Sequence, residues 1–389
     1  MTKSKTKRSF WISLFWAVGI MIVSTMIAIW ITGYTYIYKT LIYTYPGIDD
    51  INIFDTRIIN DSGPQPWPLS SQYNKIKLSA DVDSELQRNQ SVAFLVIKND
   101  SIVYEQYWDH HIENSLINSF SVAKSIVSIL CGIAIRDGLI SLDDSVGKYI
   151  PEFKDGDNGK LKIRHLLTMS SGLNWDESYN SLFSLTTEAY YGTDLKGLVT
   201  HLKVIEEPGK VFRYMSCNTV LLAMIISKAS GMMISDYAAK FLWKPIGATQ
   251  PAYWSLDHNE GFEKAYCCFY STARDFAKIG KLYMGDGIWN GRMIVPFNYM
   301  RESVSPNGCV DENGKSVNYY GYHWWLMDFQ EHKIFYARGI LGQYIIVIPD
   351  ERIIIVRLGK LRGEKNNNNQ YTDMIAYMNG ALKIFGTRK

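Results

Sequence analysis

A long apolar segment close to the N-terminus is the feature that most constrains how this chain can fold. Residues 10–31 are predominantly apolar, and no charged residue occurs between Arg8 and Lys39. An apolar run of this length can cross the hydrocarbon core of a bilayer as a helix, which needs about 20 residues. Basic residues gather before the segment and are almost absent just after it, which favours a cytoplasmic N-terminus.

A cleaved signal peptide is the competing interpretation of this segment. Its apolar core is longer than the roughly 7–15 residues of a typical signal peptide, and no small-x-small cleavage pattern follows in residues 33–38. We therefore predict a cytoplasmic basic tail over residues 1–8 and a single-pass transmembrane signal anchor over residues 9–38. With either interpretation the rest of the chain lies outside the cytoplasm, which means the periplasm in a Gram-negative cell.

The remainder of the chain divides into a linking segment and a large folded part. Residues 39–75 carry several proline and glycine turn signals without helical periodicity, which predicts an extended stalk. Residues 76–389 are predicted to form the folded domain, because 47% hydrophobic and 20% charged residues are typical of a globular chain. The net charge of +3 comes from interspersed acids and bases, so no nucleic-acid partner is expected.

The order of the predicted strands and helices indicates an α+β fold. Both ends of the domain are rich in β-branched and aromatic residues, whereas the middle has helical periodicity. Strands are predicted at residues 92–97, 102–104, 319–327, 333–337, 344–348 and 352–358, and helices at 121–136, 163–169, 219–230 and 371–385. We therefore predict one antiparallel sheet from both chain ends, flanked by helices, with a mostly helical subdomain inserted at about residues 140–265.

A serine and a lysine three residues apart stand at the start of the predicted helix 121–136. Residues at this spacing share a helix face, so the hydroxyl of Ser121 and the amine of Lys124 can meet. Burial disfavours the charged form of an amine, so Lys124 can act as a base. On the motif alone, a serine cap beside a solvated lysine is the stronger interpretation. The spacing recurs at Ser4–Lys7 and Ser145–Lys148, and the latter copy lies in a polar stretch where its lysine is expected to stay solvated.

The sequence around Ser121 resembles the active-serine region of a known superfamily. The run 118–153, NSFSVAKSIVSILCGIAIRDGLISLDDSVGKYIPEF, is similar to that of class C β-lactamases, penicillin-binding proteins and related serine hydrolases. The resemblance continues in four further blocks, at residues 163–173, 208–214, 271–275 and 287–291. It implies a β-lactamase/transpeptidase-like fold in which Ser121 is the nucleophile and Lys124 handles its proton.

The second motif of the superfamily, Tyr-x-Asn, corresponds here to Tyr214-Met215-Ser216. By this resemblance, Tyr214 works with the serine and lysine and relays a proton to the leaving group. The alternative is that Tyr214 is one packed aromatic residue among 26 tyrosines. Ser216 stands where β-lactamases have the asparagine that holds the substrate amide, and this departure weakens a β-lactamase assignment.

The third motif, a strand reading Lys-Thr-Gly or His-x-Gly, corresponds to Ala337-Arg338-Gly339. Glycine lets a substrate lie close to the strand. The resemblance implies that the backbone N–H groups of Ile340 and Ser121 form an oxyanion hole. Ala337 lacks the cation that usually helps to recognise a carboxylate, and Arg338 replaces it only if it faces the substrate, since alternate strand residues point to opposite faces. The alternative, which the sequence supports equally, is that Arg338 is a solvent-exposed arginine on the strand. This stretch is most similar to the 6-aminohexanoate-dimer hydrolases.

Other chemistries have little support in the sequence. There is no G-x-S-x-G elbow, no H-E-x-x-H pattern and no glycine-rich phosphate or dinucleotide loop, so no metal or organic cofactor is expected. The five cysteines form no C-x-x-C pair. Adjacent Cys267 and Cys268 are predicted to be buried free thiols, because a bond between neighbouring residues is geometrically unfavourable. Cys131 is predicted to be a small core residue.

The sequence thus predicts a membrane-anchored serine hydrolase that cleaves a small-molecule amide or ester through an acyl-enzyme on Ser121. The predicted substrate contacts are Ser216, Ala337, Arg338 and Gly339. Three alternatives remain: a β-lactamase or D-Ala-D-Ala carboxypeptidase, an esterase, and a non-catalytic, membrane-tethered binding module. No oligomeric state is predicted.

Overall fold

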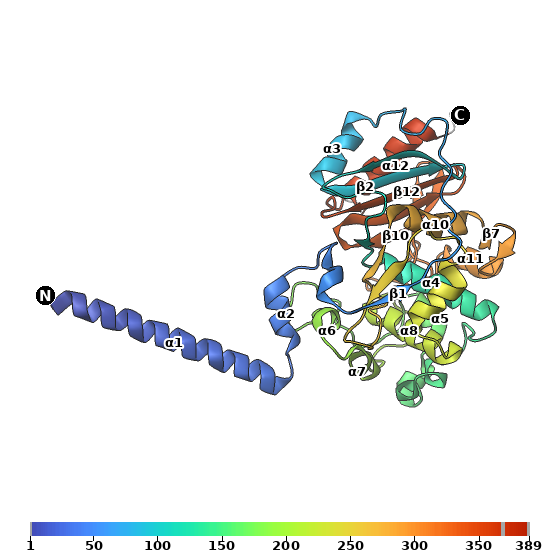
Figure 1. Ribbon diagram of the computed structural model, residues 1–389. Helices are drawn as coiled ribbons and strands as arrows, with labels where there is room; N and C mark the ends of the chain where they lie inside the picture. Colours follow the sequence, from blue (N-terminus) through green and yellow to red (C-terminus); the bar gives the residue numbers. More distant parts are fainter. Residues whose placement is uncertain (1, 367–369, 387–389) are drawn as a thin grey trace.

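A six-stranded antiparallel sheet lies at the centre of the domain (Figure 1). The computed structural model describes residues 2–366 and 370–386 of the 389-residue chain. The strands, in their spatial order, are β3 (Ser101–Tyr107), β2 (Ser91–Lys98), β12 (Ile353–Gly359), β11 (Gln343–Ile348), β10 (His332–Gly339) and β9 (Trp325–Phe329). The N-terminal hairpin joins the C-terminal strands where β2 pairs with β12. This confirms the prediction of a sheet assembled from both ends of the domain.

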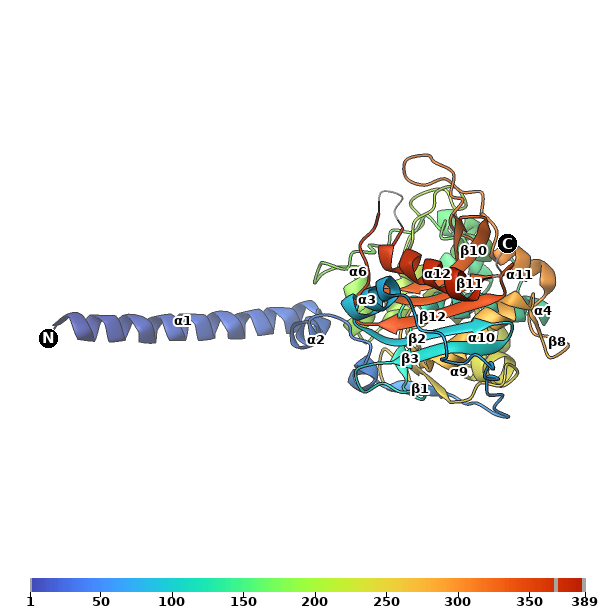
Figure 2. The ribbon, with the colours of Figure 1, turned by 90° about the horizontal axis from the view of Figure 1, so that it is seen from above.

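Helices cover both faces of this sheet because both faces are apolar. Alternate residues of β2 belong to different core clusters, with Leu95 on one face and Phe94 on the other. Figure 2 shows α3 (Ala80–Arg88) and α12 (Thr372–Phe385) beside each other on one face. The opposite face packs against α4 (Val122–Arg136) and α10 (Ala273–Met284), so α4 lies in the middle of the domain.

The middle of the chain is mainly helical and packs around α4. Helices α5 and α9 are short, and α8 ends at Gly231 in a left-handed conformation, as its sequence suggests. The helices are α5 (Ile163–Leu167), α6 (Leu185–Tyr191), α7 (Leu195–Thr200), α8 (Ser216–Ser230), α9 (Ile234–Ala238), a π-helical turn (Ala239–Trp243) and α11 (Phe297–Ser303). Single 3₁₀ turns occupy Val146–Lys148, Pro151–Phe153 and Gly156–Lys160. A separate two-stranded ribbon consists of β7 (Ile288–Trp289) and β8 (Arg292–Met293).

The segment 39–75 is not the extended stalk that its turn signals predicted. It continues α2 (Tyr36–Tyr43), forms a 3₁₀ turn at Asp50–Ile53, and contributes β1 (Thr56–Ile59) to a second sheet. This sheet has the order β1, β5 (Ala252–Ser255), β6 (Phe269–Ser271) and β4 (Ile117–Asn118). The segment packs on the domain because its scattered apolar residues, which lack any helical period, include Ile48, Ile59 and Trp67, and all three are buried.

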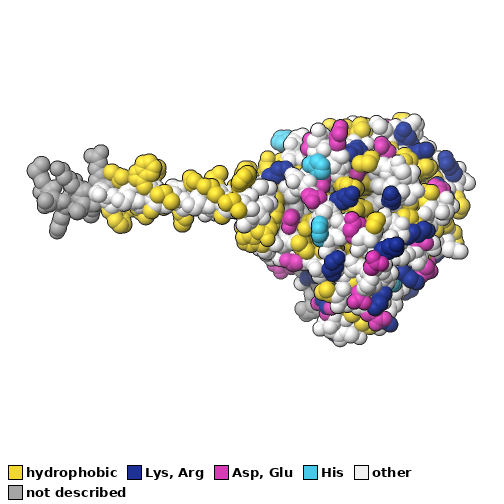
Figure 3. Space-filling view, turned by 90° about the horizontal axis from the view of Figure 1, so that it is seen from below, with side chains coloured by type: hydrophobic (Ala, Val, Ile, Leu, Met, Phe, Trp, Pro, Cys, Tyr) yellow, Lys and Arg dark blue, Asp and Glu magenta, His cyan; other side chains and the backbone are white. Residues whose placement is uncertain are grey.

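The N-terminal helix α1 (Thr2–Thr32) projects away from the domain (Figures 1 and 2). Among the described residues, its part Ser9–Thr32 is a single helix long and apolar enough to cross a membrane. Figure 3 shows its apolar side chains exposed along its length. The predicted span 9–38 is not one continuous helix. Gly33 adopts a positive φ of 79°, and α2 begins at Tyr36 as a separate helix.

Candidate active site

The start of α4 brings Ser121 and Lys124 into contact. Ser121 directly precedes the helix, and Lys124 lies one turn later on the same face. The Nζ atom of Lys124 donates a hydrogen bond to Ser121 Oγ at 3.0 Å and another to the backbone carbonyl of Tyr266 at 2.9 Å. The Lys124 residue is only 1% exposed, so the amine lies in the protein interior rather than in solvent.

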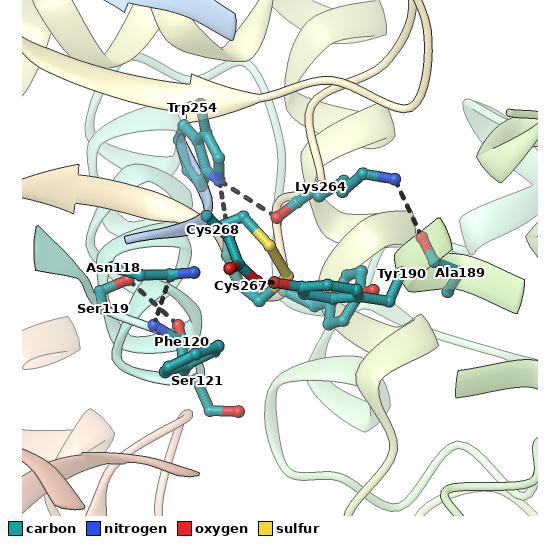
Figure 4. Close-up of a disulfide and its surroundings, with 12 residues drawn as sticks. Asn118, Ser119, Phe120, Ser121, Ala189, Tyr190, Trp254, Lys264, Cys267 and Cys268 are labelled. Atoms are coloured by element: carbon teal, nitrogen blue, oxygen red, sulfur yellow. Dashed lines mark hydrogen bonds between the residues drawn. A yellow bond between two sulfur atoms is a disulfide. The ribbon is translucent and has the colours of Figure 1, made fainter. Parts of the chain in front are cut away.

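The backbone turn before Ser121 is held by a buried amide. Phe120 has a positive φ of 43°, which is uncommon for a residue with a side chain. The side-chain oxygen of Asn118 accepts a hydrogen bond from the Phe120 N–H at 2.9 Å, and the Asn118 amide donates to the Tyr270 hydroxyl. Figure 4 shows Asn118 beside this turn and the Ser121 hydroxyl pointing away from it. These bonds hold the backbone from which Ser121 enters α4.

The end of β10 approaches the same turn closely. A Cβ atom on Gly339 would lie 2.5 Å from the carbonyl oxygen of Ser119, so only glycine allows this approach. Ile340 follows in a 3₁₀ turn, Ile340–Gly342. In the described part of the chain, neither the N–H of Ser121 nor that of Ile340 has an acceptor. These two amides are thus available to an oxygen atom placed between them.

Ala337 and Arg338 lie on opposite faces of β10. Ala337 is completely buried in the core and does not line the cavity described below, so the predicted substrate contact through Ala337 is wrong for this structure. The Arg338 guanidinium lies 3.7 Å from the ring centroid of Trp325 and 5.0 Å from that of Tyr371. Strand alternation therefore turns Arg338, rather than Ala337, toward the cavity.

Tyr214 lies beside the lysine without bonding to it. Lys124 Nζ is 5.1 Å from the centroid of the Tyr214 ring, and the ring also packs on Trp325 at 5.6 Å. Among the described residues, the Tyr214 hydroxyl makes no hydrogen bond, including none to Ser121 or Lys124. The structure thus brings the three predicted groups together, but the phenol is not yet within bonding range.

Ser216 is hydrogen-bonded to Glu177, a residue that the sequence motifs did not identify. Its N–H and its hydroxyl both donate to the carboxylate of Glu177, each at 2.6 Å. The same carboxylate accepts from Trp175 Nε1 at 2.6 Å and from the Tyr179 hydroxyl at 2.5 Å. Two of these partners lie only two positions from Glu177, but Ser216 lies 39 positions away, and no sequence motif marks this pair. Ser216 is therefore bound to the protein rather than offered to a substrate amide.

A cavity of about 760 Å³ opens over Ser121. Six of the predicted site residues line it: Ser121, Tyr214, Ser216, Arg338, Gly339 and Ile340. A second cation, Arg362, also lines it, and no ion pair is present for Arg338 or Arg362 in the described part of the chain. Its volume is in the range of small-molecule sites.

The prediction for Cys267 and Cys268 is wrong, since the structure joins them in a disulfide (Figure 4). Cys268 has a positive φ of 60°, and this turn brings the two adjacent side chains together. Cys267 lines the cavity, and the preceding residue, Tyr266, supplies the carbonyl that binds Lys124. Cys131 is a fully buried free thiol, which confirms the prediction for that residue. The described residues contain no group of three or more His, Cys, Asp or Glu placed to hold a metal ion.

Comparisons with known proteins agree with this geometry. The Beta-lactamase family model matches residues 80–375. The chain is 25% identical to the 6-aminohexanoate-dimer hydrolase of Paenarthrobacter ureafaciens over 296 residues, which covers 72% of this chain and 74% of that protein. A solved structure from Bacillus anthracis, provisionally assigned as a 6-aminohexanoate-dimer hydrolase, superposes with a TM-score of 0.74 at 21% identity, covering 85% of this chain and 90% of that one.

A class C β-lactamase structure superposes less closely, with a TM-score of 0.60 at 17% identity, covering 79% of this chain and 96% of that one. These likenesses confirm the predicted β-lactamase/transpeptidase-like fold.

Proposed function

Because the chain belongs to the beta-lactamase family, we propose that it is a serine hydrolase that cleaves an amide or ester bond through an acyl-enzyme on Ser121. The observation that carries this proposal is the 3.0 Å contact between the buried Lys124 amine and Ser121 Oγ at the floor of an open cavity. A binding module that had lost turnover would have no need of a buried amine on its serine.

Lys124 is the base that activates the nucleophile in this proposal. Its amine contacts a hydroxyl and a backbone carbonyl, and no salt bridge involves it among the described residues. Its Nζ lies within hydrogen-bonding distance of the hydroxyl whose proton it has to accept, as a general base must. Lys124 therefore accepts the proton of Ser121 as Oγ attacks the substrate carbonyl carbon.

The oxyanion that forms in this step is stabilised by backbone amides. The unengaged N–H groups of Ser121 and Ile340 border the same cavity, and the close approach of Gly339 to Ser119 holds their two segments together. They donate hydrogen bonds to the carbonyl oxygen as it becomes negatively charged.

Tyr214 is assigned the protonation of the leaving group. The phenol has to turn toward the Ser121–Lys124 pair, or act through one water, once substrate is bound, and catalytic hydrogen bonds are often long before binding. The carbon–oxygen or carbon–nitrogen bond then breaks, and the alcohol or amine leaves with the phenol's proton. Lys124 passes the proton of Ser121 on to Tyr214, and a water molecule hydrolyses the Ser121 ester.

The unpaired cations Arg338 and Arg362 favour a substrate that carries an anionic group. Both guanidinium groups border the cavity next to the Tyr371 ring, at 5.0 and 4.3 Å from its centroid. They provide the positive charge that Ala337 lacks, and a guanidinium binds a carboxylate through two parallel hydrogen bonds. The engagement of Ser216 by Glu177 distinguishes this site from one with a free asparagine amide.

The helix Ser9–Thr32 is proposed to anchor the enzyme in the cell membrane, with the N-terminus in the cytoplasm and the hydrolase domain outside. Support comes from its length, from the exposure of nearly all its side chains and from the basic residues that precede it.

A fluorophosphonate probe tests the proposed function directly. The wild-type protein is expected to be labelled and the Ser121→Ala variant is not, while hydrolysis of p-nitrophenyl esters and short anilides is lost in parallel. Equal labelling of both proteins would disprove the assignment. Covalent labelling of wild type by a fluorescent penicillin would instead identify a β-lactam-binding enzyme.

A further inference from the structure

One wall of the active-site cavity comes from the segment that directly follows the apolar helix. Residues of α2 and of the turn after it, among them Leu41 and Tyr45, line the same cavity as Ser121. Leu41 is nine positions after Thr32, and most of the intervening chain is helical. The cavity wall therefore lies within roughly 20 Å of the end of the span.

Helix α2 lies level with the last turns of α1 rather than beyond them. The Tyr38 hydroxyl donates a hydrogen bond to the backbone carbonyl of Met26 at 2.5 Å, and Met26 is six positions inside the end of the span. Ile29 packs against the domain core from the same end of α1. When Ser9–Thr32 spans a bilayer, α2 is thus held in the interfacial region of its outer leaflet. Four of the five tyrosines between positions 34 and 45 are at least partly exposed and suit this place, because tyrosine favours the membrane–water interface.

Exposed apolar side chains surround the cavity on this side. Ile42 on α2 is 73% exposed, and Phe183, on the loop before α6, is 67% exposed. The Phe183 ring lies 6.0 Å from that of Tyr34, in the link between α1 and α2, so this loop contacts the chain just after the apolar helix. Figure 3 shows apolar side chains gathered where the helix meets the domain. Leu41 and Leu182 belong to this exposed rim and also line the cavity.

We propose that this rim rests in the bilayer surface and that the substrate is a bilayer-resident amphiphile, an ester or amide with a long acyl chain. The proposal rests on the proposed serine hydrolase activity and names its substrate class. An exposed apolar rim that continues a membrane span is covered by lipid at no cost, whereas in water it would be unfavourable. The substrate moves sideways from the leaflet into the cavity, past Leu41 and Leu182, without its chain crossing water.

The acyl chain then meets aromatic and apolar walls. Tyr190 and Tyr191 of α6 face the cavity together with Pro46, and its volume of about 760 Å³ exceeds the need of an acetyl group. In the reaction, the acyl carbon bonds to Ser121 Oγ, the bond to the leaving oxygen or nitrogen breaks, and that atom takes the proton. Water then releases the fatty acid.

The test compares two substrates in vesicles that carry the full-length protein. One is p-nitrophenyl butyrate dissolved in the buffer, and the other is p-nitrophenyl palmitate in the phosphatidylcholine bilayer. The double variant Ile42→Ser, Phe183→Ser alters the rim without touching a cavity-lining residue. The matched control is Ile288→Ser on β7, which is 50% exposed and lies on the far side of the domain from α2 (Figure 1). Helix α1 keeps every variant on the vesicle.

We expect the rim variant to hydrolyse palmitate about tenfold more slowly and butyrate at the wild-type rate, because two apolar side chains no longer hold the cavity mouth at the lipid surface. Ile288→Ser is expected to change neither rate. Unchanged palmitate hydrolysis by the rim variant, or an equal loss on both substrates, overturns the inference while Ser121-dependent hydrolysis stands. Butyrate hydrolysis that survives Ser121→Ala instead refutes the proposed function itself.

Discussion

The Ser-x-x-Lys pattern occurs twice in the domain, at Ser121–Lys124 and at Ser145–Lys148, and each copy has a tyrosine ring 5.1 Å from its lysine amine. Lys124 is 1% exposed and bonds to its own serine. The Lys148 side chain is 57% exposed and pairs with Asp144 at 3.0 Å, while Ser145 Oγ accepts the Gly147 N–H. The expectation of a solvated Lys148 is confirmed.

The tyrosines beside the two lysines also differ in the hydrogen bonding of their hydroxyls. Tyr149 donates hydrogen bonds to Asp144 at 2.6 Å and to the Leu139 carbonyl at 3.1 Å, so its hydroxyl is used by the fold. The Tyr214 hydroxyl has no partner within the described residues and borders the cavity. Equal spacing therefore yields a structural cluster in one place and the proposed catalytic triad in the other. The surroundings differ, because Lys124 is buried and pairs with no carboxylate among the described residues, whereas Lys148 is exposed and pairs with Asp144.

Replacing each serine by alanine is expected to give the largest difference between the two copies. Ser121→Ala is expected to lower p-nitrophenyl ester hydrolysis by roughly 10³-fold or more, since it removes the nucleophile. Ser145→Ala is expected to keep wild-type rates, because Ser145 serves a local turn. Initial rates of both variants decide the matter, and activity retained by Ser121→Ala would show that the copies do not differ in chemistry.

Replacing the lysines is expected to have the next largest effect. Lys124→Met keeps the length of the side chain but removes the base, and a loss of about 10²- to 10⁴-fold in kcat is expected. Lys148→Met is expected to leave kcat unchanged. Circular dichroism serves as the folding control for both variants. A folded Lys124→Met protein with near-normal kcat would contradict the assigned base.

Removing the tyrosine hydroxyls separates activity from stability. Tyr214→Phe is expected to lower anilide hydrolysis by about 10²-fold, because a poor leaving group needs the proton. The loss with a p-nitrophenyl ester is expected to be much smaller, since that group leaves as an anion. Equal losses on the two substrates would refute the proton transfer from Tyr214. The control, Tyr149→Phe, is expected to retain wild-type rates on both.

The smallest expected effect is on acid stability near Asp144. Burial raises the pKa of this carboxyl, but hydrogen bonds from Tyr149, Lys148 and the Ser141 N–H lower it more, so its net pKa lies below the ordinary 3.8. Such a carboxylate contributes stability above its unfolded pKa and loses it as the pH falls through the folded value.

Tyr149→Phe is therefore expected to reduce the free energy of unfolding by about 1 kcal/mol at pH 7. The difference from wild type is expected to shrink at pH 3, because the Asp144 carboxyl of the unfolded chain is then mostly protonated. Urea denaturation at both pH values measures this, and a difference that grows on acidification would contradict the role given to Tyr149.

Several features followed from local sequence because their causes are local. The β-branched and aromatic residues of 92–97 and 102–104 predicted the strands β2 and β3, and the apolar run after Ser121 predicted a buried α4. The prediction for β9 was less accurate. A strand was predicted at residues 319–327, but residues 319–324 are irregular and only 325–327 of that range pair with β10. The Ser121–Lys124 contact followed from helical spacing.

Other features arise from contacts between distant segments. Glu177 meets Ser216 across 39 positions, and Lys124 meets the Tyr266 carbonyl across 142. No local pattern encodes such pairs, and the same is true of the packing of segment 39–75 on β5. The disulfide between Cys267 and Cys268 depends on a turn whose positive φ the sequence did not reveal.

By itself, the sequence determined the apolar span, the order of strands and helices, and a serine and lysine on one helix face, because backbone periodicity and apolar patterning act over a few residues. Only the tertiary structure decided what the Lys124 amine contacts, that Arg338 rather than Ala337 lines the cavity, and that α2 forms one wall of that cavity. Burial, and with it the reactivity of an amine, is a property of everything packed around a group, and that packing joins residues far apart in the chain.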